Sequence, residues 1–273
     1  MHKMSFFSKK IINWQKINGR NNLPWQAKSP YHVWISEIML QQTQVKTVVP
    51  YFHKFINSFP SIKSLAESNL DNVLASWSGL GYYTRAKNIH LTSKIIHEKY
   101  NGSIPNNYDQ LIELPGIGES TAGALLSLAF DEPGIILDGN VKRVLSRVLA
   151  NQSPINHSKT QNELKKFANE ILPKKNFRIY SQGMMDLGSL ICTSLNPSCE
   201  SCPIKSKCKS FELNLQNSIP VKTSKNPKKE RNIKWVLISS KDKVLLKRNK
   251  SKGVWQNLWL FPEENYFDDK KFN

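Results

Sequence analysis

The chain has 273 residues, and its 39 Lys and Arg residues outnumber its 21 Asp and Glu residues, which makes the formal net charge +18. This length is enough for two domains with a substantial core. The positive charge, with an aromatic content of 10%, favours a nucleic acid partner over a merely solvated lysine-rich surface. No apolar run reaches the ~18 residues of a membrane span, and the N-terminus has no signal-peptide core. We therefore exclude a membrane partner and expect a cytoplasmic, nucleoid-associated protein.

Two helices are predicted near the N-terminus. The first is indicated by apolar residues at helical spacing, namely Ile11, Ile12, Trp14 and Ile17. In the second, we expect Ser29 at the N-cap and Pro30 at the first helical position, and the helix continues to residue 43.

Glu37 lies within the second helix among apolar residues. An anion is disfavoured in such surroundings, so the pKa of this carboxyl should be raised, and the group is suited to general acid catalysis near neutral pH. The alternative is a carboxylate on the solvent-facing side of the helix. Gln41 and Gln42 follow, and such amides either face solvent or hydrogen-bond the edges of bases.

A further helix is predicted over Leu70–Trp77, with Ser68 as its N-cap. The segment SGLGYYTRAK (78–87) combines glycines, two tyrosines and two basic residues. Such a loop either inserts an aromatic wedge beside a phosphate or buries its tyrosines in a turn between helices. Another helical stripe follows, and Gly102 is placed to end that helix.

The segment LPGIGESTAGALL (114–126) reads as a glycine turn between two helices, the first over residues 108–113. Gly116 and Gly118 permit positive φ, and Ser120 or Thr121 is expected to cap the second helix. The turn either presents backbone N–H groups to a phosphate or is a plain helical hairpin. Asp138 stands just before another amphipathic helix, in LDGNVKRVLSR (137–147).

Helices are predicted over residues 158–172 and 177–192, and four cysteines follow with the spacing C-x6-C-x2-C-x5-C. Four thiols within 17 residues indicate a metal ion or cluster in a reducing compartment. A zinc site usually has two short Cys pairs, whereas this chain has one, so the spacing favours an iron–sulfur cluster.

The last part of the chain changes character. Residues 215–234 form a basic, linker-like stretch, and residues 235–249 predict a β-hairpin around Lys241-Asp242-Lys243. About 40 residues of β-type sequence are too few for an independent core.

The motifs LPW (23–25), SEIMLQQTQV (36–45), GLGYY (79–83), MMDLG (184–188), the hairpin, the Asp138 segment and the cysteines occur in a distinctive order. From about Trp14 to Cys208 the chain resembles the adenine DNA glycosylase (MutY) family of the helix-hairpin-helix, or endonuclease III, superfamily. The resemblance implies a mostly α, two-lobed fold with an Fe–S cluster loop and a short C-terminal β fragment. It also implies a helical-barrel domain (23–131), a cluster domain (1–22 and 132–214), a linker (215–232) and a partial Nudix-like fragment (233–273).

The resemblance implies a monofunctional DNA glycosylase of base excision repair, which hydrolyses the N-glycosidic bond of adenine mispaired with 8-oxoguanine or guanine after base flipping. Such chemistry suits two carboxyl groups with different pKa values. Glu37 would protonate the departing base and later activate water. Asp138, ionised near a helix N-terminus, would stabilise the cationic sugar, and Asn140 would support it.

Further roles follow from the resemblance alone. Gln42 and Tyr82 would wedge the base stack, Gln26 and Gln182 would line the adenine pocket, and the Gly116–Gly118 hairpin would hold a phosphate with a monovalent cation. Other expected DNA contacts are Trp25, Gln41, Thr43 and Ser120. Cys192, Cys199, Cys202 and Cys208 would hold a structural [4Fe–4S] cluster. The expected partner is double-stranded DNA with an adenine mispair, bound by a monomer.

Two departures from related sequences bear on the activity. Ser120 stands where the bifunctional relatives of endonuclease III type carry a catalytic Lys, so Schiff-base strand cleavage is not expected. Residues 233–262 resemble only the opening of the Nudix-like domain and lack its acidic box, which predicts a weaker preference for 8-oxoguanine over guanine. The alternatives are a pyrimidine-lesion glycosylase/lyase and a DNA-binding module without catalysis.

Overall fold

The structure is a computed structural model that describes residues 5–26, 29–223, 230–251, 253 and 255–264. Its first half contains α1 (Phe6–Asn18), α2 (Pro30–Leu40), α3 (Val45–Ser58), α4 (Ile62–Ala66), α5 (Leu70–Trp77), α6 (Thr84–Lys99), α7 (Tyr108–Ile112) and α8 (Glu119–Ala124). A π-helical turn, η1 (Leu125–Ala129), continues α8. The remaining helices are α9 (Gly139–Leu149), α10 (Ser158–Glu170), α11 (Phe177–Asp186), the π-helical turn η2 (Leu187–Ile191), the 3-10 turns η3 (Cys199–Ser201) and η4 (Lys205–Lys207), and α12 (Lys209–Glu212).

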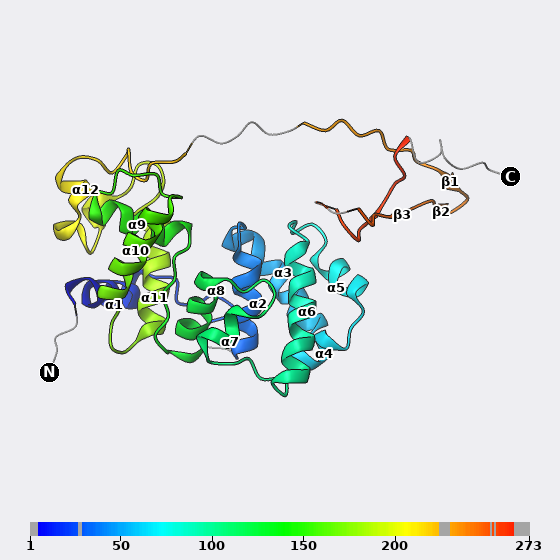
Figure 1. Cartoon of the computed structure of the whole chain (residues 1–273), viewed down its shortest axis with the longest axis horizontal. Coiled ribbons are helices and arrows are strands. Elements are labelled where there is room, and N and C mark those ends of the chain that lie inside the picture. The colour runs from blue at the N-terminus through cyan, green and yellow to red at the C-terminus, as the bar shows by residue number, and fades with distance from the viewer. Residues whose placement is uncertain (1–4, 27–28, 224–229, 252, 254, 265–273) are drawn as a thin grey trace.

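The helices form two lobes, each around its own hydrophobic core (Figure 1). The first core is built from α2 to α8 and centres on fully buried residues such as Trp34, Phe55 and Trp77. The second joins α1 to α9, α10 and α11. Helix α1 therefore begins the chain but packs in the lobe made by its later part.

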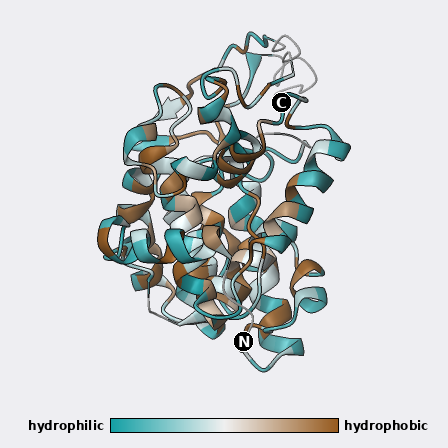
Figure 2. Cartoon of the chain, turned by 90° about the vertical axis from the view of Figure 1, so that its left-hand side faces the viewer, coloured by the Kyte–Doolittle hydropathy of each residue, from teal (hydrophilic) through white to brown (hydrophobic). Residues whose placement is uncertain are grey.

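Helix amphipathicity explains which side of each helix enters a core. In Figure 2 the helices carry hydrophobic residues on one side and hydrophilic residues on the other. Helix α2 is the exception, because Val33, Trp34, Ile35, Ile38 and Met39 are all buried and surround the helix on most sides. An all-round apolar helix belongs in the interior of a helical protein, so Glu37 is carried on a buried helix.

Several local predictions need correction. Helix α2 ends at Leu40 rather than at residue 43, because Gln42 adopts a left-handed φ of 59° that no helix can continue. Asn69, not Ser68, caps α5, and its side chain accepts from the Asp71 N–H. Gly118 is the N-cap of α8 in place of Ser120 or Thr121.

Ile17 also departs from the predicted apolar face of α1, since 82% of it is exposed. Ile11 and Ile12 are buried, so their place on the predicted apolar face of α1 is confirmed. The Ser29 N-cap and the Pro30 start of α2 are confirmed as well. Asp138 stands just before α9, as predicted, and is the N-cap of that helix.

Two glycines allow close packing around the segment that leads to Asp138 and α9. A Cβ on Gly123 would lie 2.1 Å from the Ile135 carbonyl oxygen, and one on Gly188 would lie 2.7 Å from the Asn140 Cβ. Both glycines lie where α-helix passes into a π-helical turn, and such turns occur often at functional sites. The segment that leads to Asp138 can therefore pass directly against α8 and η2.

Among the described residues, the C-terminal part contains only short strands. β1 (Ser239–Ser240) pairs antiparallel with β2 (Lys243–Val244), as the hairpin prediction requires, and β3 (Lys247–Arg248) pairs with β4 (Trp259–Leu260). Leu258 packs against the first core, and Arg248 forms an ion pair with Asp71 at 3.0 Å. This fragment thus lies beside α5, in the lobe away from the cysteines (Figure 1). None of the described helices is long and apolar enough to cross a membrane.

Candidate active site

A cleft of about 1060 Å³ is lined by residues from both lobes. The first lobe contributes Glu37 and the segment after α2, together with Ser120 and Thr121 from α8. The second contributes residues 136–140, Arg143, Gln182 and part of η2. A cleft of this size, with convergent polar groups, is the default candidate for a binding site.

Glu37 lines the cleft from the buried helix α2. Asp138 lines the same cleft. Burial and, to a smaller extent, the charge of Asp138 together raise the pKa of the Glu37 carboxyl from 4.5 to about 7. The predicted pKa rise is therefore confirmed, and Glu37 can hold a proton at neutral pH.

Asp138 is held in a different environment, at the N-terminus of α9. Its Oδ1 accepts from the Val141 N–H at 2.7 Å, and its Oδ2 accepts from the Asn140 Nδ2 at 3.3 Å. Donors and the helix dipole both favour negative charge at this position. Glu37 and Asp138 therefore form a pair of carboxyl groups in unlike surroundings on one cleft.

Asn140 is oriented by Arg143, whose Nη2 donates to the Asn140 Oδ1 at 2.9 Å and to the Gly188 carbonyl at 2.7 Å. The Nε of the same arginine donates to the Cys192 carbonyl at 2.8 Å. Arg143 thus joins α9, η2 and the start of the cysteine segment. Because the Asn140 Oδ1 accepts from the Arg143 Nη2, the Asn140 amide must turn its Nδ2 toward Asp138.

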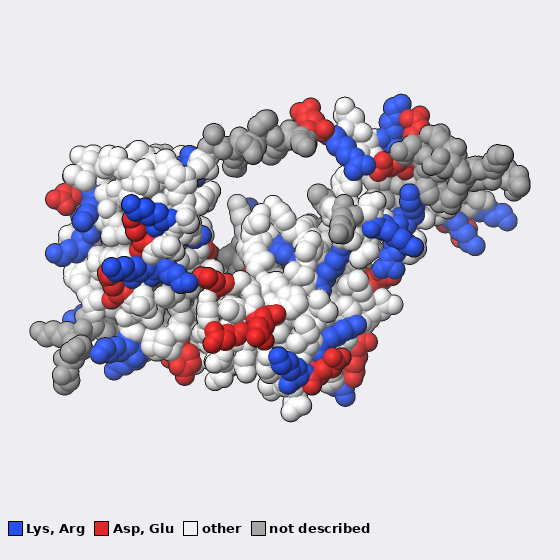
Figure 3. Space-filling model, viewed as in Figure 1, with Lys and Arg blue, Asp and Glu red and all other residues white. Residues whose placement is uncertain are grey.

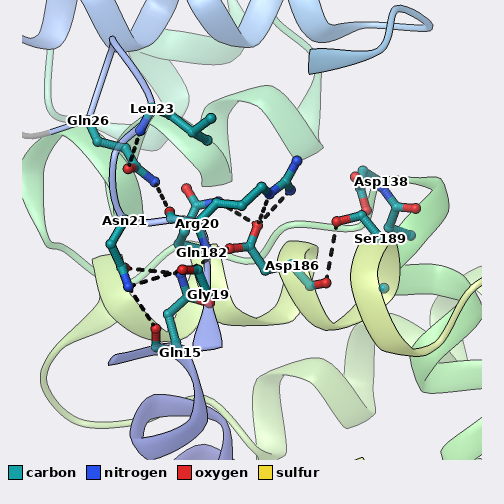
Figure 4. Close-up of polar contacts among 12 residues, drawn as sticks. Gln15, Gly19, Arg20, Asn21, Leu23, Gln26, Asp138, Gln182, Asp186 and Ser189 are labelled. Carbon is teal, nitrogen blue, oxygen red and sulfur yellow. Dashed lines mark hydrogen bonds and ion pairs between the residues drawn. The ribbon is translucent and has the colours of Figure 1, made fainter. Parts of the chain in front are cut away.

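Figure 4 shows a second polar group beside the cleft, centred on Asp186 of α11. Two nitrogens of the Arg20 guanidinium donate to the same oxygen, Asp186 Oδ1, Nε at 2.9 Å and Nη2 at 2.6 Å. Gln182, one helical turn earlier, donates to the same oxygen at 2.9 Å. Arg20 and Gln182 both line the cleft, whereas Asp186 is fully buried behind them.

The segment after α2 is held by Arg85, a buried residue of α6. Its guanidinium donates to the carbonyls of Ile38, Met39 and Gln41 and to the Thr43 hydroxyl, and also to the carbonyls of Leu80 and Gly81. These contacts satisfy carbonyls at the end of α2 and connect them to the segment before Tyr82. Gln42 and Tyr82 both have left-handed φ values, 59° and 50°.

The glycine hairpin has one residue in the left-handed region and one outside it. Gly116 has a φ of 84°, and a Cβ there would lie 2.8 Å from the Asn88 Cβ. Gly118 is extended and has open space around it, so the predicted need for two flexible glycines holds only for Gly116. Ser120 accepts from the Leu137 N–H at 3.0 Å and so anchors the segment that precedes Asp138.

The structure brings most of the predicted site residues together, but not all. Those that line the cleft are Trp25, Glu37, Gln41, Gln42, Thr43, Ser120, Asp138, Asn140 and Gln182. Gln26 is not among the lining residues, because its amide bonds the backbone of its own loop at Leu23 and Arg20. Tyr82, Gly116 and Gly118 also lie outside the cleft lining, and Tyr82 is 57% exposed.

Four residues that position the site were not predicted from the sequence, namely Arg20, Arg85, Arg143 and Asp186. The only signal for Arg85 was its place in a glycine- and tyrosine-rich segment. Asp186 stands in a motif that carried the family resemblance, but its partner Arg20 is 166 residues away in the chain. Nothing in local spacing links two residues that far apart.

The four cysteines lie beyond η2 and are all free of disulfide bonds. Burial raises the pKa of the Cys199 thiol, and charge on Cys192 and Cys208 raises it further. Arg147, itself buried, donates to the Cys192 Sγ at 3.3 Å. Among the described residues, no three His, Cys, Asp or Glu side chains converge as ligands of a metal ion.

Four free thiols with an arginine N–H on one sulfur form a donor set that fits an iron–sulfur cluster. A cluster takes one thiolate on each of several iron atoms, and N–H donors to sulfur stabilise its negative charge. Its ligands therefore need not converge on one point.

Charge on the face shown in Figure 3 is mixed, with Lys and Arg spread over both lobes and acidic residues among them. The basic groups in the cleft lining are Arg20, Lys46 and Arg143. Positive charge along the cleft lining suits a phosphate backbone.

Comparison with known proteins agrees with this geometry. Residues 35–170 match the model of the HhH-GPD superfamily of base excision DNA repair proteins. A thermostable thymine-DNA glycosylase superposes with a TM-score of 0.69 at 25% identity, over 76% of this chain and 95% of that one. An endonuclease III in a non-covalent DNA complex gives a TM-score of 0.64 at 24% identity, over 77% and 95% of the two chains. The fold is thus the mostly helical HhH-GPD glycosylase fold, with small C-terminal strands added.

Proteins with similar sequences identify the family within this superfamily. The chain is 47% identical to an adenine DNA glycosylase of Buchnera aphidicola subsp. Baizongia pistaciae, over 94% of this chain and 73% of that protein. It is 46% identical to the adenine DNA glycosylase of subsp. Schizaphis graminum, over 97% and 76%, and 33% identical to that of Homo sapiens, over 76% and 40%. The chain therefore belongs to the adenine DNA glycosylase family of base excision repair, and the resemblance seen in its motifs is confirmed.

Proposed function

We propose that the protein removes adenine mispaired with 8-oxoguanine or guanine in double-stranded DNA by hydrolysing the N-glycosidic bond. The observation that carries this proposal is the pair Glu37 and Asp138, one with a pKa of about 7 and one at a helix N-terminus, on a single cleft between two lobes. A base can reach such a cleft only when its nucleotide is flipped out of the duplex.

The chemistry divides between the two carboxyl groups. Glu37 donates its proton to the adenine ring as the C1′–N9 bond breaks, and the bonding electron pair leaves with the base. The sugar becomes an oxocarbenium-like cation, which the Asp138 carboxylate stabilises, or bonds transiently, with support from Asn140. Glu37, now ionised, takes a proton from the water that attacks C1′, and this transfer restores its acid form.

The DNA duplex would be held from the first lobe. Gln42 and Tyr82 are presented on segments tied together by Arg85, and Tyr82 is exposed enough to enter a base stack as a wedge. Gln41 donates to the Thr121 hydroxyl at 3.3 Å, which joins this segment to α8. The Gly116–Gly118 hairpin would contact a phosphate together with a monovalent cation, and a monomer would suffice for the complex.

Cys192, Cys199, Cys202 and Cys208 would hold a [4Fe–4S] cluster. When bound, this group supplies structural support to the segment after η2, with Arg147 beside the Cys192 sulfur. We also propose the domain boundaries implied by the family resemblance, with residues 23–131 in one domain and residues 1–22 and 132–214 in the other.

Iron and acid-labile sulfide analysis tests the cluster. We expect about four of each per chain, as a [4Fe–4S] centre requires. Replacing Cys202 by Ala should remove this content and make the chain after η2 sensitive to protease. One zinc per chain without sulfide would contradict the cluster.

Base release under single-turnover conditions tests the activity. Duplexes with adenine opposite 8-oxoguanine or guanine should release adenine, whereas Glu37→Gln should slow release by about 10²–10⁴-fold. A duplex of the same sequence in which adenine is paired with thymine serves as the control. Unchanged release by Glu37→Gln would overturn the assignment of the acid.

Borohydride trapping tests the alternative of a lyase. A Schiff base needs an amine nucleophile, and Ser120 offers only a hydroxyl, which already accepts from Leu137. We expect no trapped covalent complex with a damaged-pyrimidine duplex. A trapped complex would favour glycosylase/lyase activity, and Lys46 in the cleft lining would be the amine to replace first.

A further inference from the structure

Asp186 is fully buried and accepts five hydrogen bonds. Oδ2 accepts from the Arg20 backbone N–H at 2.7 Å and from the Gln15 Nε2 at 3.0 Å. Oδ1 accepts from the Arg20 guanidinium and from the Gln182 Nε2. The carboxylate thus holds α1, α11 and the loop after α1 together (Figure 4).

The contact with Gln182 fixes which way that amide points. An ionised carboxylate accepts hydrogen bonds and cannot donate them, so only the NH₂ end of the amide can face Asp186. The Gln182 Oε1 must then point away from it. This oxygen has no protein donor among the described residues, yet it is not one of the fully buried unpaired atoms, so it is accessible from the cleft that Gln182 lines.

We propose that Asp186 is a positioning residue that holds the Gln182 amide with its oxygen toward the cleft, and thereby makes the site select a 6-amino purine over a 6-oxo purine. The 6-amino group of adenine is a hydrogen-bond donor, whereas the 6-oxo group of guanine or hypoxanthine is an acceptor. A fixed amide oxygen accepts from the first and repels the second. This inference rests on the proposed excision of adenine.

Two substitutions at Asp186 separate this role from simple structural support. Asp186→Leu removes both acceptors, so the Gln182 amide is free to turn its NH₂ toward a 6-oxo group. Asp186→Asn can keep an acceptor at the Oδ1 position, facing the guanidinium and Gln182. Its NH₂ would face Gln15, whose own Oε1 is buried and unpaired and can accept after the Gln15 amide turns over, and the Arg20 backbone N–H, which loses its acceptor. The Asn variant should therefore be less stable than the wild type but keep the orientation of the Gln182 amide.

The experiment measures single-turnover excision of adenine and of hypoxanthine, each opposite 8-oxoguanine, and compares the ratio of the two rates among variants. Asp186→Leu should lower the adenine-to-hypoxanthine ratio by about tenfold or more, whereas Asp186→Asn should keep it near the wild-type value. Gln15→Leu is the matched control, because it removes a hydrogen bond to Oδ2 without contacting the cleft. It should lower the melting temperature but leave the ratio unchanged.

The outcomes are distinct. If the wild-type chain releases no adenine, the proposed function fails; if it does and Asp186→Leu keeps the wild-type ratio, only the role of Asp186 fails. Equal losses of selectivity in the Leu and Asn variants would also overturn it. If Asp186→Leu does not fold, the orientation of the Gln182 amide is tested with the wild-type protein instead. Its affinity is measured for duplexes that contain 2′-fluoro nucleotides, which resist cleavage. Equal binding of 2′-fluoro-deoxyadenosine and 2′-fluoro-deoxyinosine would exclude a fixed amide oxygen.

Discussion

Individual residues of the cleft owe their chemistry to what surrounds them. Glu37 sits on an all-round apolar helix, so its neutral form is favoured, whereas Asp138 caps α9 and accepts from N–H groups. Glu37 can therefore hold a proton near neutral pH, whereas Asp138 lies where N–H donors and a helix N-terminus favour negative charge. Gln182 shows the same dependence, because a buried carboxylate behind it decides which end of its amide faces the cleft.

The pH dependence of excision follows from Glu37. A general acid must be protonated, so the rate constant should be highest below pH 7 and fall about tenfold per pH unit once the pH exceeds the pKa of about 7. Single-turnover rates between pH 5 and 9 measure this. Glu37→Gln should be slow and flat over the same range, and a wild-type rate that rises through pH 7 would contradict the role.

Glu37 should also make stability depend on pH. Its pKa is about 7 when folded and 4.5 in the reference state, so the native state holds more protons between these values and the free energy of unfolding falls as pH rises through that window. Glu37→Gln removes this loss and should stabilise the fold at pH 8 by on the order of 1–3 kcal/mol. Urea unfolding of both proteins at pH 5 and pH 8 measures the difference, and identical pH profiles would exclude it.

At the scale of elements, the ends of helices position the site. Helix α2 stops at Leu40, and the segment that follows carries Gln41, Gln42 and Thr43 into the cleft. Helix α9 starts at the residue after Asp138. The π-helical turn η1 lies where the lobes meet, since it packs against both α2 and α11, whereas η2 packs against α9 and α11 within the second lobe.

The two hairpin glycines should differ in their tolerance of Ala. Gly116→Ala places a Cβ at a φ of 84° and against Asn88, and should lower the free energy of unfolding by about 1–3 kcal/mol. Gly118→Ala meets open space and an ordinary φ, so its effect on stability should stay within about 0.5 kcal/mol. Denaturant titration compares them, and equal losses would refute the assignment of strain to Gly116 alone.

Arg85 should be irreplaceable by Lys. An ammonium cannot reproduce the planar fork that reaches carbonyls on both sides of the guanidinium. Arg85→Lys should cost about 2–4 kcal/mol in unfolding free energy, because it leaves buried carbonyls without donors, and should weaken binding of mispaired duplex. Arg178→Lys is the control, since Arg178 is exposed and donates to the carbonyls of Leu128 and Ala129. Equal stability losses in the two variants would contradict the role of Arg85.

On the scale of the whole molecule, the cleft exists only because two cores meet. Glu37 belongs to a helix of the first core and Asp138 to a segment against the second, so neither lobe alone contains both carboxyl groups. The C-terminal fragment adds large apolar side chains that stay exposed among the described residues, including Leu237, Trp255 and Trp259. Such a small fragment buries too little surface to form a core of its own.

The positive charge of the molecule should appear in the salt dependence of DNA binding. Lys46 lines the cleft, and if it contacts a phosphate, Lys46→Gln should reduce the slope of log affinity against log salt by about one unit. Lys16→Gln is the control, because Lys16 is exposed on α1 and does not line the cleft. Fluorescence anisotropy at several salt concentrations measures both slopes, and equal slopes would place Lys46 away from the DNA.

Local chemistry allowed much of the site to be predicted. The apolar neighbours of Glu37, the position of Asp138 before an amphipathic helix and the turn at Gly116 are properties of short segments, and short segments fold by rules that their own residues supply. The end of α2 was predicted three residues too late, because Gln41 and Gln42 are acceptable in a helix. It is Arg85, from another helix, that provides donors for the carbonyls of a shorter one.

The sequence by itself identified the candidates for the chemistry: two carboxyl groups in unlike local surroundings, a glycine turn and four thiols. The tertiary structure decided which of them share a cleft, that Gln26 turns away from it, and that Arg20 and Asp186 stand behind Gln182. The reason is physical. Propensity and burial pattern act within about one helical turn, whereas the orientation of a buried polar side chain depends on partners that packing brings from far along the chain.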